Sequence, residues 1–430
     1  MVLTGRLFAL VVAGVIPTIA YPRFWVVLGW VMLCVVLLGI DILTAGSTQA
    51  IQLYRMPSAP VRLGHPGSST LLVHNITNRK FRAHIKDAWQ PSAGASGSVH
   101  QVAIGPGERQ AVTTALLPTR RGDRAAYRVT IRRLGPLGLA GRQRSFLVPG
   151  SIRALPPFTS RTLLPSRLAR LRQLDGRSAV RIRGQGTEFD SLRDYVDGDD
   201  VRSIDWRATA RRRSTVVRTW QPEKDRHIVI VLDTSRTSAG RVGDAPRLDA
   251  AMDAALLLAA LAAHAGDRVD LIAGDRVIHR RVVGAPRTTL LGDLVNAMTA
   301  LEPALVEADW PLLAAQVSKL TRQRALVVLL TPLEPAAVEE SLLPPLAVLA
   351  QRYRVLIGSV GDPELADMIT RRGDTAEIYG AAAAARSITA RQRTETALSR
   401  LGVDVVDAPP EQLPAALADR YLTLKSHGLL

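Results

Sequence analysis

The sequence after residue 226 alternates between short apolar strands and longer helical segments, and this pattern restricts the possible fold most. The stretch HIVIVLD (227–233) contains the continuous apolar run IVIVL before its final aspartate, as expected of a parallel strand buried on both faces. A long helical segment follows at 247–266. Further strands are predicted at 267–275, 325–331, 353–360 and 403–408. The alternation predicts an α/β domain over 227–430, with a doubly wound sheet and helices on both faces.

Polar side chains stand directly after two of these strands, where α/β proteins bind ligands. Asp233 ends the first strand, and Ser235 and Thr237 follow it at alternate positions, so an extended loop would point all three the same way. Thr331 ends another predicted strand. Mg²⁺ prefers oxygen ligands of this kind. The sequence therefore indicates a metal site at this edge of the sheet.

A second metal-binding loop would come from Thr288 or Thr289, at the start of a predicted helix. Each candidate also has a structural explanation. Asp233 can cap a turn, and the hydroxyls of Ser235 and Thr237 can satisfy backbone groups of the loop. A threonine at a helix start is also a suitable N-cap. Both interpretations remain open at this point.

Residues 1–45 are dominated by two uncharged apolar runs, at 7–21 and 24–40. A bilayer-spanning helix needs about 17–25 apolar residues, a length that the second run reaches and the first does not. We predict a transmembrane helical hairpin, with Trp25 and Trp30 near a membrane interface. A cleaved signal peptide followed by a single span is the alternative.

A hairpin returns the chain to the side on which it began. Arg6 before the hairpin, with Arg55 and Arg62 after it, favours the cytoplasm by the positive-inside rule, whereas Arg23 in the connecting loop argues the other way. We predict an inner-membrane protein whose soluble domains face the cytoplasm. A single span would instead place them outside.

Two further parts separate the anchor from the α/β domain. Residues 46–150 contain short alternating segments between Gly, Pro and Ser clusters, which predicts an immunoglobulin-like β-sandwich. Residues 151–226 are rich in arginine, with fifteen Arg or Lys against nine Asp or Glu between 161 and 224. Such a mixture is typical of a solvated surface with many salt bridges.

The carboxylates from Asp197 to Asp205 have two interpretations. In the structural interpretation, Asp199 and Asp200 form ion pairs with Arg202 and Arg207. Trp206 packs against its neighbours. In the catalytic one, the same carboxylates act with Asp233 in a metal-dependent hydrolase. The structural interpretation is the simpler of the two.

Composition and motifs exclude several other functions. The net charge of +17 raises nucleic-acid or anionic-lipid binding as an alternative, but the charge is spread thinly and only 4% of residues are aromatic. The single cysteine, Cys34, rules out a disulfide within the chain. Neither H-E-x-x-H nor a phosphate-binding G-x-x-x-x-G-K-S/T occurs, and GASGS (94–98) lacks the last glycine of a nucleophile elbow. We therefore expect no enzyme, and no role for His264 or His279 as metal ligands.

The segment before the first α/β strand carries the most specific pattern. Residues 186–235 read GTEFDSLRDYVDGDDVRSIDWRATARRRSTVVRTWQPEKDRHIVIVLDTS. Two elements follow one another there, Arg-x-Tyr-x-x-Gly-Asp-Asp (193–200) and Arg-x-Ile-Asp-Trp (202–206). Three further elements stand upstream, namely RRGD (120–123), GPLGLAGRQ (135–143) and LPPF (155–158). The chain resembles the bacterial domain of unknown function 58 family. Asp-x-Ser-x-Thr after the strand resembles the metal-ion-dependent adhesion site (MIDAS) of von Willebrand factor A-like domains.

The resemblance implies a membrane-anchored β-sandwich followed by a von Willebrand factor A-like domain without catalytic activity. It implies a MoxR-type AAA+ ATPase as partner, often with a transglutaminase-like membrane protein, and a scaffold role in assembly or maturation of other proteins. No nucleic acid is expected. Thr237 stands where serine is more usual, and Pro332 follows Thr331 where an aspartate is common. Because a carboxylate is lost there, we expect a weak Mg²⁺ site or none.

Overall fold

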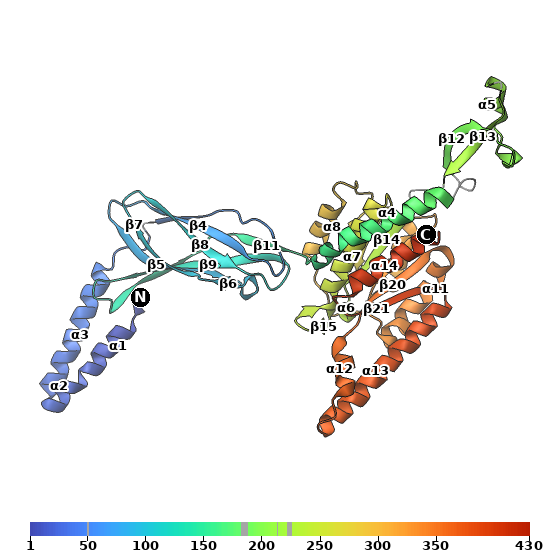
Figure 1. Cartoon of the computed structure of the whole chain (residues 1–430). Coiled ribbons are helices and arrows are strands. Elements are labelled where there is room, and N and C mark those ends of the chain that lie inside the picture. The colour runs from blue at the N-terminus through green and yellow to red at the C-terminus, as the bar shows by residue number, and fades with distance from the viewer. Residues whose placement is uncertain (50, 182–187, 213, 222–225) are drawn as a thin grey trace. The chain divides into compact units, whose positions relative to one another are not determined.

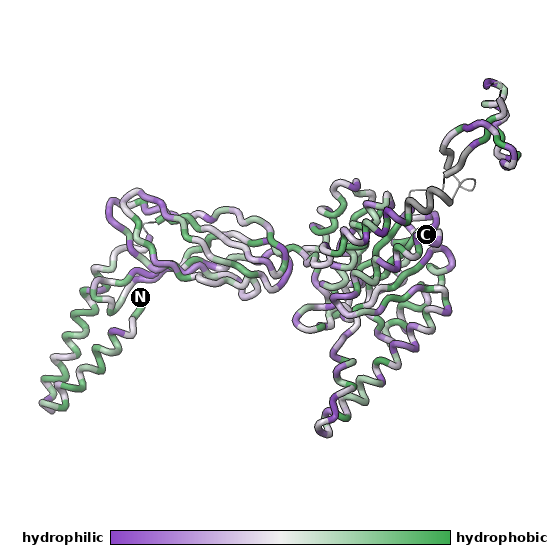
Figure 2. The backbone as a smooth tube through the Cα atoms, in the orientation of Figure 1, coloured by the Kyte–Doolittle hydropathy of each residue, from purple (hydrophilic) through white to green (hydrophobic). Residues whose placement is uncertain are grey.

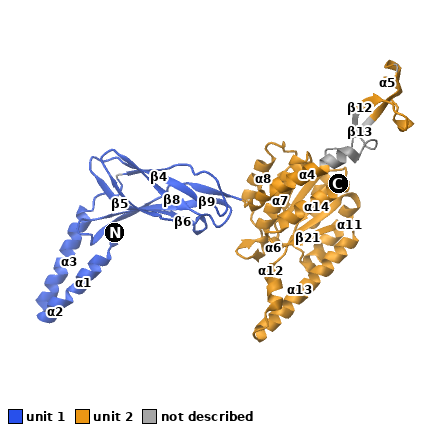
Figure 3. Ribbon diagram, in the orientation of Figure 1, with its two compact units in different colours: residues 1–155 blue, residues 156–430 orange. Residues whose placement is uncertain are grey.

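The chain divides into two compact units, Met1–Leu155 and Pro156–Leu430 (Figures 1 and 3). The computed structural model describes residues 1–49, 51–181, 188–212, 214–221 and 226–430. We call residues 186–235 the signature segment; its first two residues, Gly186 and Thr187, lie outside the described residues. The fold is mixed α/β with several separate sheets.

The first unit begins with three apolar helices: α1 (Gly5–Ala13), α2 (Val15–Ala20) and α3 (Phe24–Thr44). Among the described residues, α3 is the one helix long and apolar enough to cross a membrane, by length and composition (Figure 2). Trp30 packs between helices, because its indole N–H donates to the Leu10 carbonyl at 3.2 Å and its ring lies against Gly14. A Cβ at Gly14 would come within 2.3 Å of that ring. Trp25, by contrast, is 75% exposed.

Two sheets with a shared core form the rest of this unit. One has the order β2 (Ile51–Arg55), β4 (Gly67–Asn75), β8 (Arg109–Leu116), β6 (Ala95–Ser96). The other has the order β1 (Val2–Leu3), β10 (Ala140–Phe146), β9 (Gly122–Leu134), β11 (Ser151–Leu155), β3 (Val61–Arg62), with β5 (Phe81–Trp89) joined to β9 and β7 (Val99–Ile104) joined to β5. Buried apolar residues alternate with exposed ones along the strands. Leu71 and Val73 of the first sheet meet Ile85, Val129 and Ile131 of the second.

A buried ion pair joins the two sheets. Arg55 of β2 donates to both carboxylate oxygens of Asp87 of β5, at 2.9 and 2.6 Å. Asp87 also accepts hydrogen bonds from the Trp89 indole at 2.9 Å and the Thr114 hydroxyl at 3.1 Å. Burial opposes ionisation of Asp87, but the hydrogen bonds from Arg55 and Trp89 and the Arg55 charge hold its pKa below the ordinary value.

One carboxylate ties α3 to the second sheet. Asp41, in the last turns of the helix, is fully buried and accepts hydrogen bonds from the amides of Leu137, Leu139 and Ala140 at 2.8, 2.7 and 2.8 Å. The backbone approaches Asp41 closely, since a Cβ at Gly135 would lie 2.1 Å from its Oδ1. The GPLGLAGRQ segment is therefore the turn that receives the end of the apolar helix.

The second unit is built on a six-stranded sheet of order β18-β17-β14-β19-β20-β21. The strands are β14 (His227–Asp233), β17 (Arg268–Gly274), β18 (Ile278–Val282), β19 (Ala325–Leu330), β20 (Arg354–Val360) and β21 (Asp404–Ala408). All pair in parallel except β18, which runs antiparallel to β17. From β14 the chain moves to β17 and β18, then returns to β19 on the other side. The strand order therefore reverses between β14 and β19, where α/β sheets leave a crevice.

Helices cover both faces of this sheet (Figure 1). On one face, α7 (Arg247–His264) is buried along nearly its whole length beneath α4 (Leu164–Arg181) and α14 (Leu413–Ser426). On the other, α9 (Trp310–Leu320) and α11 (Leu343–Arg352) pack against Val229 and Val231. The remaining helical segments are η2 (Thr159–Leu163), α6 (Arg236–Ala239), α8 (Leu290–Thr299), α10 (Pro335–Ala337), η4 (Val338–Leu342), α12 (Pro363–Thr370) and α13 (Thr375–Arg400). Two of these helices, α9 and α12, were not predicted; each is short and has a proline in its first turn.

The arginine-rich segment also contains regular structure that was not predicted. A β-hairpin of β12 (Glu188–Asp194) and β13 (Val216–Gln221) carries η3 (Val201–Ser203) and α5 (Trp206–Arg211) between its strands. Val216 and Val217 are buried, and Ile204 forms a bridge to Val217. A small ribbon of β15 (Arg241–Val242) and β16 (Ala245–Pro246) lies between β14 and α7, and a short helix η1 (Pro91–Ala93) lies between β5 and β6 of the first unit.

Candidate functional site

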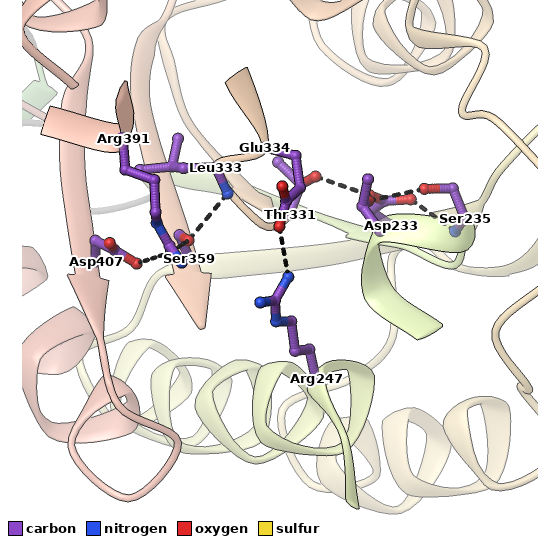
Figure 4. Close-up of polar contacts among 10 residues, drawn as sticks. Asp233, Ser235, Arg247, Thr331, Leu333, Glu334, Ser359, Arg391 and Asp407 are labelled. Carbon is purple, nitrogen blue, oxygen red and sulfur yellow. Dashed lines mark hydrogen bonds and ion pairs between the residues drawn. The ribbon is translucent and has the colours of Figure 1, made fainter. Parts of the chain in front are cut away.

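Four residues from two strand ends converge at the reversal point of the sheet, and Asp233, Ser235 and Thr331 among them are labelled in Figure 4. We call Asp233, Ser235, Thr237 and Thr331 the strand-end cluster. Asp233 Oδ2 accepts hydrogen bonds from the hydroxyls of Thr237 at 3.0 Å and Thr331 at 2.7 Å. Asp233 Oδ1 accepts one from the Ser235 amide at 2.8 Å, and the Ser235 and Thr237 hydroxyls lie 3.1 Å apart. The pairing of β14 with β19 brings the two loops together, because parallel neighbours end at the same edge.

The chemistry of this cluster is that of one carboxylate among hydroxyls. Asp233 is only 1% exposed. Burial raises its pKa above the ordinary value, although hydrogen bonds from Ser235, Thr331 and Thr237 stabilise the ionised form. All the side-chain ligands on offer are oxygens, which suits a hard cation such as Mg²⁺. Within the described ranges, no three His, Cys, Asp or Glu side chains are grouped so as to hold a metal ion.

The prediction that Thr288 or Thr289 supplies the second loop is wrong. Because β18 runs antiparallel to β17, the chain leaves it at the amino edge of the sheet, away from Asp233. The Gly284 amide there donates to Asp270 Oδ1 at 2.8 Å, near the beginning of β17. Thr288 and Thr289 follow directly after this point and are exposed.

The loop between α8 and α9 occupies the place next to the first loop instead. The Ala304 amide donates to the Thr234 carbonyl, and the Arg236 amide donates to the Val306 carbonyl, both at 2.8 Å. A shallow pocket opens here, lined by Ser235, Thr237, Thr331, Glu307, Trp310 and Val338 among others. Glu307 was not among the predicted site residues. The signal that could have found it is an acidic residue in the loop that follows the β17–β18 hairpin and α8.

The third loop directs its carboxylate away from Asp233. Glu334 accepts a hydrogen bond from Arg247, at the start of α7, at 2.8 Å (Figure 4). The Leu333 amide donates to the Ser359 hydroxyl at 3.1 Å, and the same hydroxyl lies 3.2 Å from Arg391 of α13. Neighbouring elements therefore fix this loop, and Glu334 is already paired.

A second buried carboxylate stands beside the cluster. Asp275, just after β17, accepts hydrogen bonds from His279 at 2.7 Å and Thr234 at 2.8 Å. Burial opposes its ionisation, but these two bonds hold its pKa below the ordinary value. His279 is thus paired with an aspartate, and His264 contacts the Ala260 carbonyl of its own helix at 2.7 Å.

The acidic segment before the α/β domain is organised differently from the prediction. Asp199 pairs with Arg193 of β12 at 2.7 and 2.5 Å. Asp205 caps α5 and pairs with Arg218 of β13 at 2.8 Å. The predicted pairing of Asp199 with Arg202 or Arg207 is wrong, because the hairpin brings Arg193 of β12 next to the loop. Trp206, predicted to pack, is 70% exposed.

Asp200 also departs from the prediction, since its carboxylate accepts from the Arg202 backbone amide at 3.0 Å. The carboxylates of Asp199, Asp200 and Asp205 are therefore engaged in local capping and ion pairs. A hydrolase built on them with Asp233 would need them to converge on one metal, an arrangement for which the described residues offer no group of three.

Comparison with known proteins identifies a family for part of the chain. Residues 191–375 match the family described as protein of unknown function DUF58. Uncharacterised proteins of Mycobacterium tuberculosis and Mycobacterium bovis are 28% identical over 187 residues, which are 42% of this chain and 57% of each relative. The match thus spans little more than half the length of these relatives.

Two similar solved structures each cover 24% of the chain. A PapD-like domain of human CEP192 shows 13% identity and a TM-score of 0.19 over 86% of its length. A FixG-related protein from Vibrio parahaemolyticus shows 10% identity and a TM-score of 0.18 over 96% of its length. TM-scores this low carry no argument about fold. Residues 191–375 are therefore similar to the DUF58 family of proteins of unknown function, and the mycobacterial relatives agree with this similarity.

Proposed function

We propose that this chain is a membrane-anchored, non-enzymatic interaction protein whose α/β domain presents the strand-end cluster to a partner protein. The observation that carries the proposal is the convergence of Asp233, Ser235, Thr237 and Thr331 beside a pocket at the reversal point of the sheet. Sites of α/β domains lie there because loops from two neighbouring strands part and expose backbone and side-chain donors.

The finer fold assignment belongs to the same proposal. A parallel sheet with one antiparallel edge strand, helices on both faces and Asp-x-Ser-x-Thr after a central strand support a von Willebrand factor A-like domain. Two sheets around a shared core support an immunoglobulin-like sandwich in the first unit. In this proposal, α1 and α2 form with α3 a membrane hairpin, and the soluble parts face the cytoplasm.

A divalent cation, Mg²⁺ by preference, would be held by the oxygens of Asp233, Ser235, Thr237 and Thr331. When bound, it would supply an open coordination position for an acidic side chain of the partner. The cluster itself would orient the cation, because its hydroxyls are already directed at the Asp233 carboxylate.

The proposed partner is a MoxR-type AAA+ ATPase, with a transglutaminase-like membrane protein as a further candidate. In this arrangement the ATPase supplies energy, and this chain supplies recognition during assembly or maturation of other proteins. The support is the resemblance of the signature segment and the family match over residues 191–375.

Co-purification tests this proposal. The full chain in detergent is used to capture a MoxR-type ATPase from the same genome, in Mg²⁺ and in EDTA. We expect Asp233→Ala to reduce capture strongly, whereas Asp244→Ala, at an exposed turn of the same domain, leaves it unchanged. Equal capture by both variants would show that the partner binds elsewhere. Equal capture in Mg²⁺ and in EDTA would show that partner binding needs no metal ion, while the strand-end cluster would remain the proposed binding face.

A further inference from the structure

The strand-end cluster has a second carboxylate within reach that the sequence analysis did not single out. The Glu307 side chain is 51% exposed and lines the same pocket as Ser235, Thr237 and Thr331. Main-chain hydrogen bonds hold its loop against the first loop, through Thr234 and Arg236 on one side and Ala304 and Val306 on the other. The position of Glu307 at the pocket is therefore set by the backbone.

The charge of the site points to a role for this residue. Asp233 alone would leave a divalent cation with an excess positive charge, and cations of this class bind more weakly as the number of charged ligands falls. Proline stands at 332, where a carboxylate would otherwise come from the third loop, and Glu334 is paired with Arg247. Among the described pocket-lining residues, Glu307 is the one that carries a carboxylate.

In the structure Glu307 pairs with Arg236, whose Nε donates to its Oε1. Both side chains are about half exposed, so water screens the pair and its contribution to stability is small. The pair can therefore be exchanged at low cost for a stronger interaction. Arg236 sits between Ser235 and Thr237 in the sequence, so its positive charge also opposes a cation at the cluster.

We propose that Glu307 is a ligand, directly or through one water, of the divalent cation held by the strand-end cluster, and that Arg236 is its counter-ion when the cation is absent. This rests on the metal site of the proposed function. Asp233 and Glu307 together supply two negative charges, which match the charge of the cation. The carboxylate missing from the third loop is thus supplied by the loop between α8 and α9.

The test is a binding titration of Mn²⁺ alone to the detergent-solubilised full chain, with free Mn²⁺ measured by electron paramagnetic resonance and Mg²⁺ as competitor. We expect Glu307→Gln to weaken binding by roughly tenfold or more, because one charged ligand is lost. Arg236→Gln should tighten binding, because a like charge is removed. Glu340→Gln is the control for general loss of negative charge, because Glu340 is exposed and lies between the pocket-lining Val338 and Ser341 without lining the pocket itself.

Opposite effects of Glu307→Gln and Arg236→Gln support the proposal, since loss of a structural ion pair would move both variants in one direction. If Asp233→Asn abolishes Mn²⁺ binding but Glu307→Gln binds as the wild type does, this inference is wrong and the metal site of the proposed function stands. If the wild type binds no Mn²⁺, both metal statements are overturned, and the capture experiment alone decides the interaction face.

Discussion

Replacement of Asp41 by alanine should release the end of the apolar helix α3 from the β-unit. The Asp41 carboxylate accepts three backbone hydrogen bonds, from Leu137, Leu139 and Ala140, and is fully buried. In Asp41→Ala these amides lose their partner, and a buried donor without a partner costs about 1–3 kcal/mol. Water can replace the partner of the exposed Leu137, so only the buried Leu139 and Ala140 amides carry this cost. At the lower end of the range their losses amount to roughly 2 kcal/mol, or about thirtyfold in the equilibrium for local opening.

Hydrogen exchange followed by mass spectrometry measures this opening directly. The full chain is reconstituted into lipid nanodiscs, and exchange is compared in peptides that cover residues 134–141. Asp41→Ala should speed exchange there by about thirtyfold. Peptides from β14 and β19, which belong to the other unit, should exchange as in the wild type.

Thr44→Ala is the matched control. Thr44 lies in the same helix, and its exposed hydroxyl donates to the Ile40 carbonyl within that helix, so its loss removes no contact to the sheet. If exchange at 134–141 in Asp41→Ala equals that in Thr44→Ala, the three hydrogen bonds do not hold the helix to the sheet, and the reasoning fails.

Two further predictions concern buried carboxylates. The pKa of Asp87 is lowered, so the pairing with Arg55 stabilises the fold above the ordinary aspartate pKa and is lost as the pH falls through the folded-state value. Protection of β5 amides from hydrogen exchange, corrected for intrinsic rates, should fall on acidification below about pH 4 in the wild type. The Asp87→Asn variant should be weakly protected at every pH. Equal acid sensitivity of the wild type and this variant would contradict the assignment. Thr331→Val removes a donor to Asp233 and should lower the free energy of unfolding of the α/β unit by about 1–2 kcal/mol in a denaturant titration, while the exposed Thr289→Val should change it little. Equal effects of the two threonine variants would refute the placement of Thr331 in the cluster.

The local pattern of the sequence was enough to locate the main elements of the α/β unit. The stretch from Ile228 to Leu232 is apolar at every position because β14 is covered on both faces there, and burial of this kind leaves a continuous apolar run. The same logic placed Asp233 and Thr331 at strand ends. Since parallel neighbours end at one edge, their convergence followed once the two strands were adjacent.

What the sequence could not decide is which loops meet, because that depends on strand order and direction. The antiparallel direction of β18 moved Thr288 and Thr289 to the far edge of the sheet and left the loop of Glu307 beside the cluster. The hairpin likewise gave Asp199 the partner Arg193, which no spacing along the loop would reveal.

The partners of Asp41 in the apolar helix α3 depend on the tertiary structure in the same way. By composition it only ends an apolar run, and nothing local indicates that a turn almost a hundred residues later supplies its hydrogen-bond donors. The sequence by itself therefore determined which segments form helices and strands, and which of these segments end in a polar side chain. Only the tertiary structure decided which polar groups are partners, because pairing across a fold is set by distance in space and not by distance along the chain.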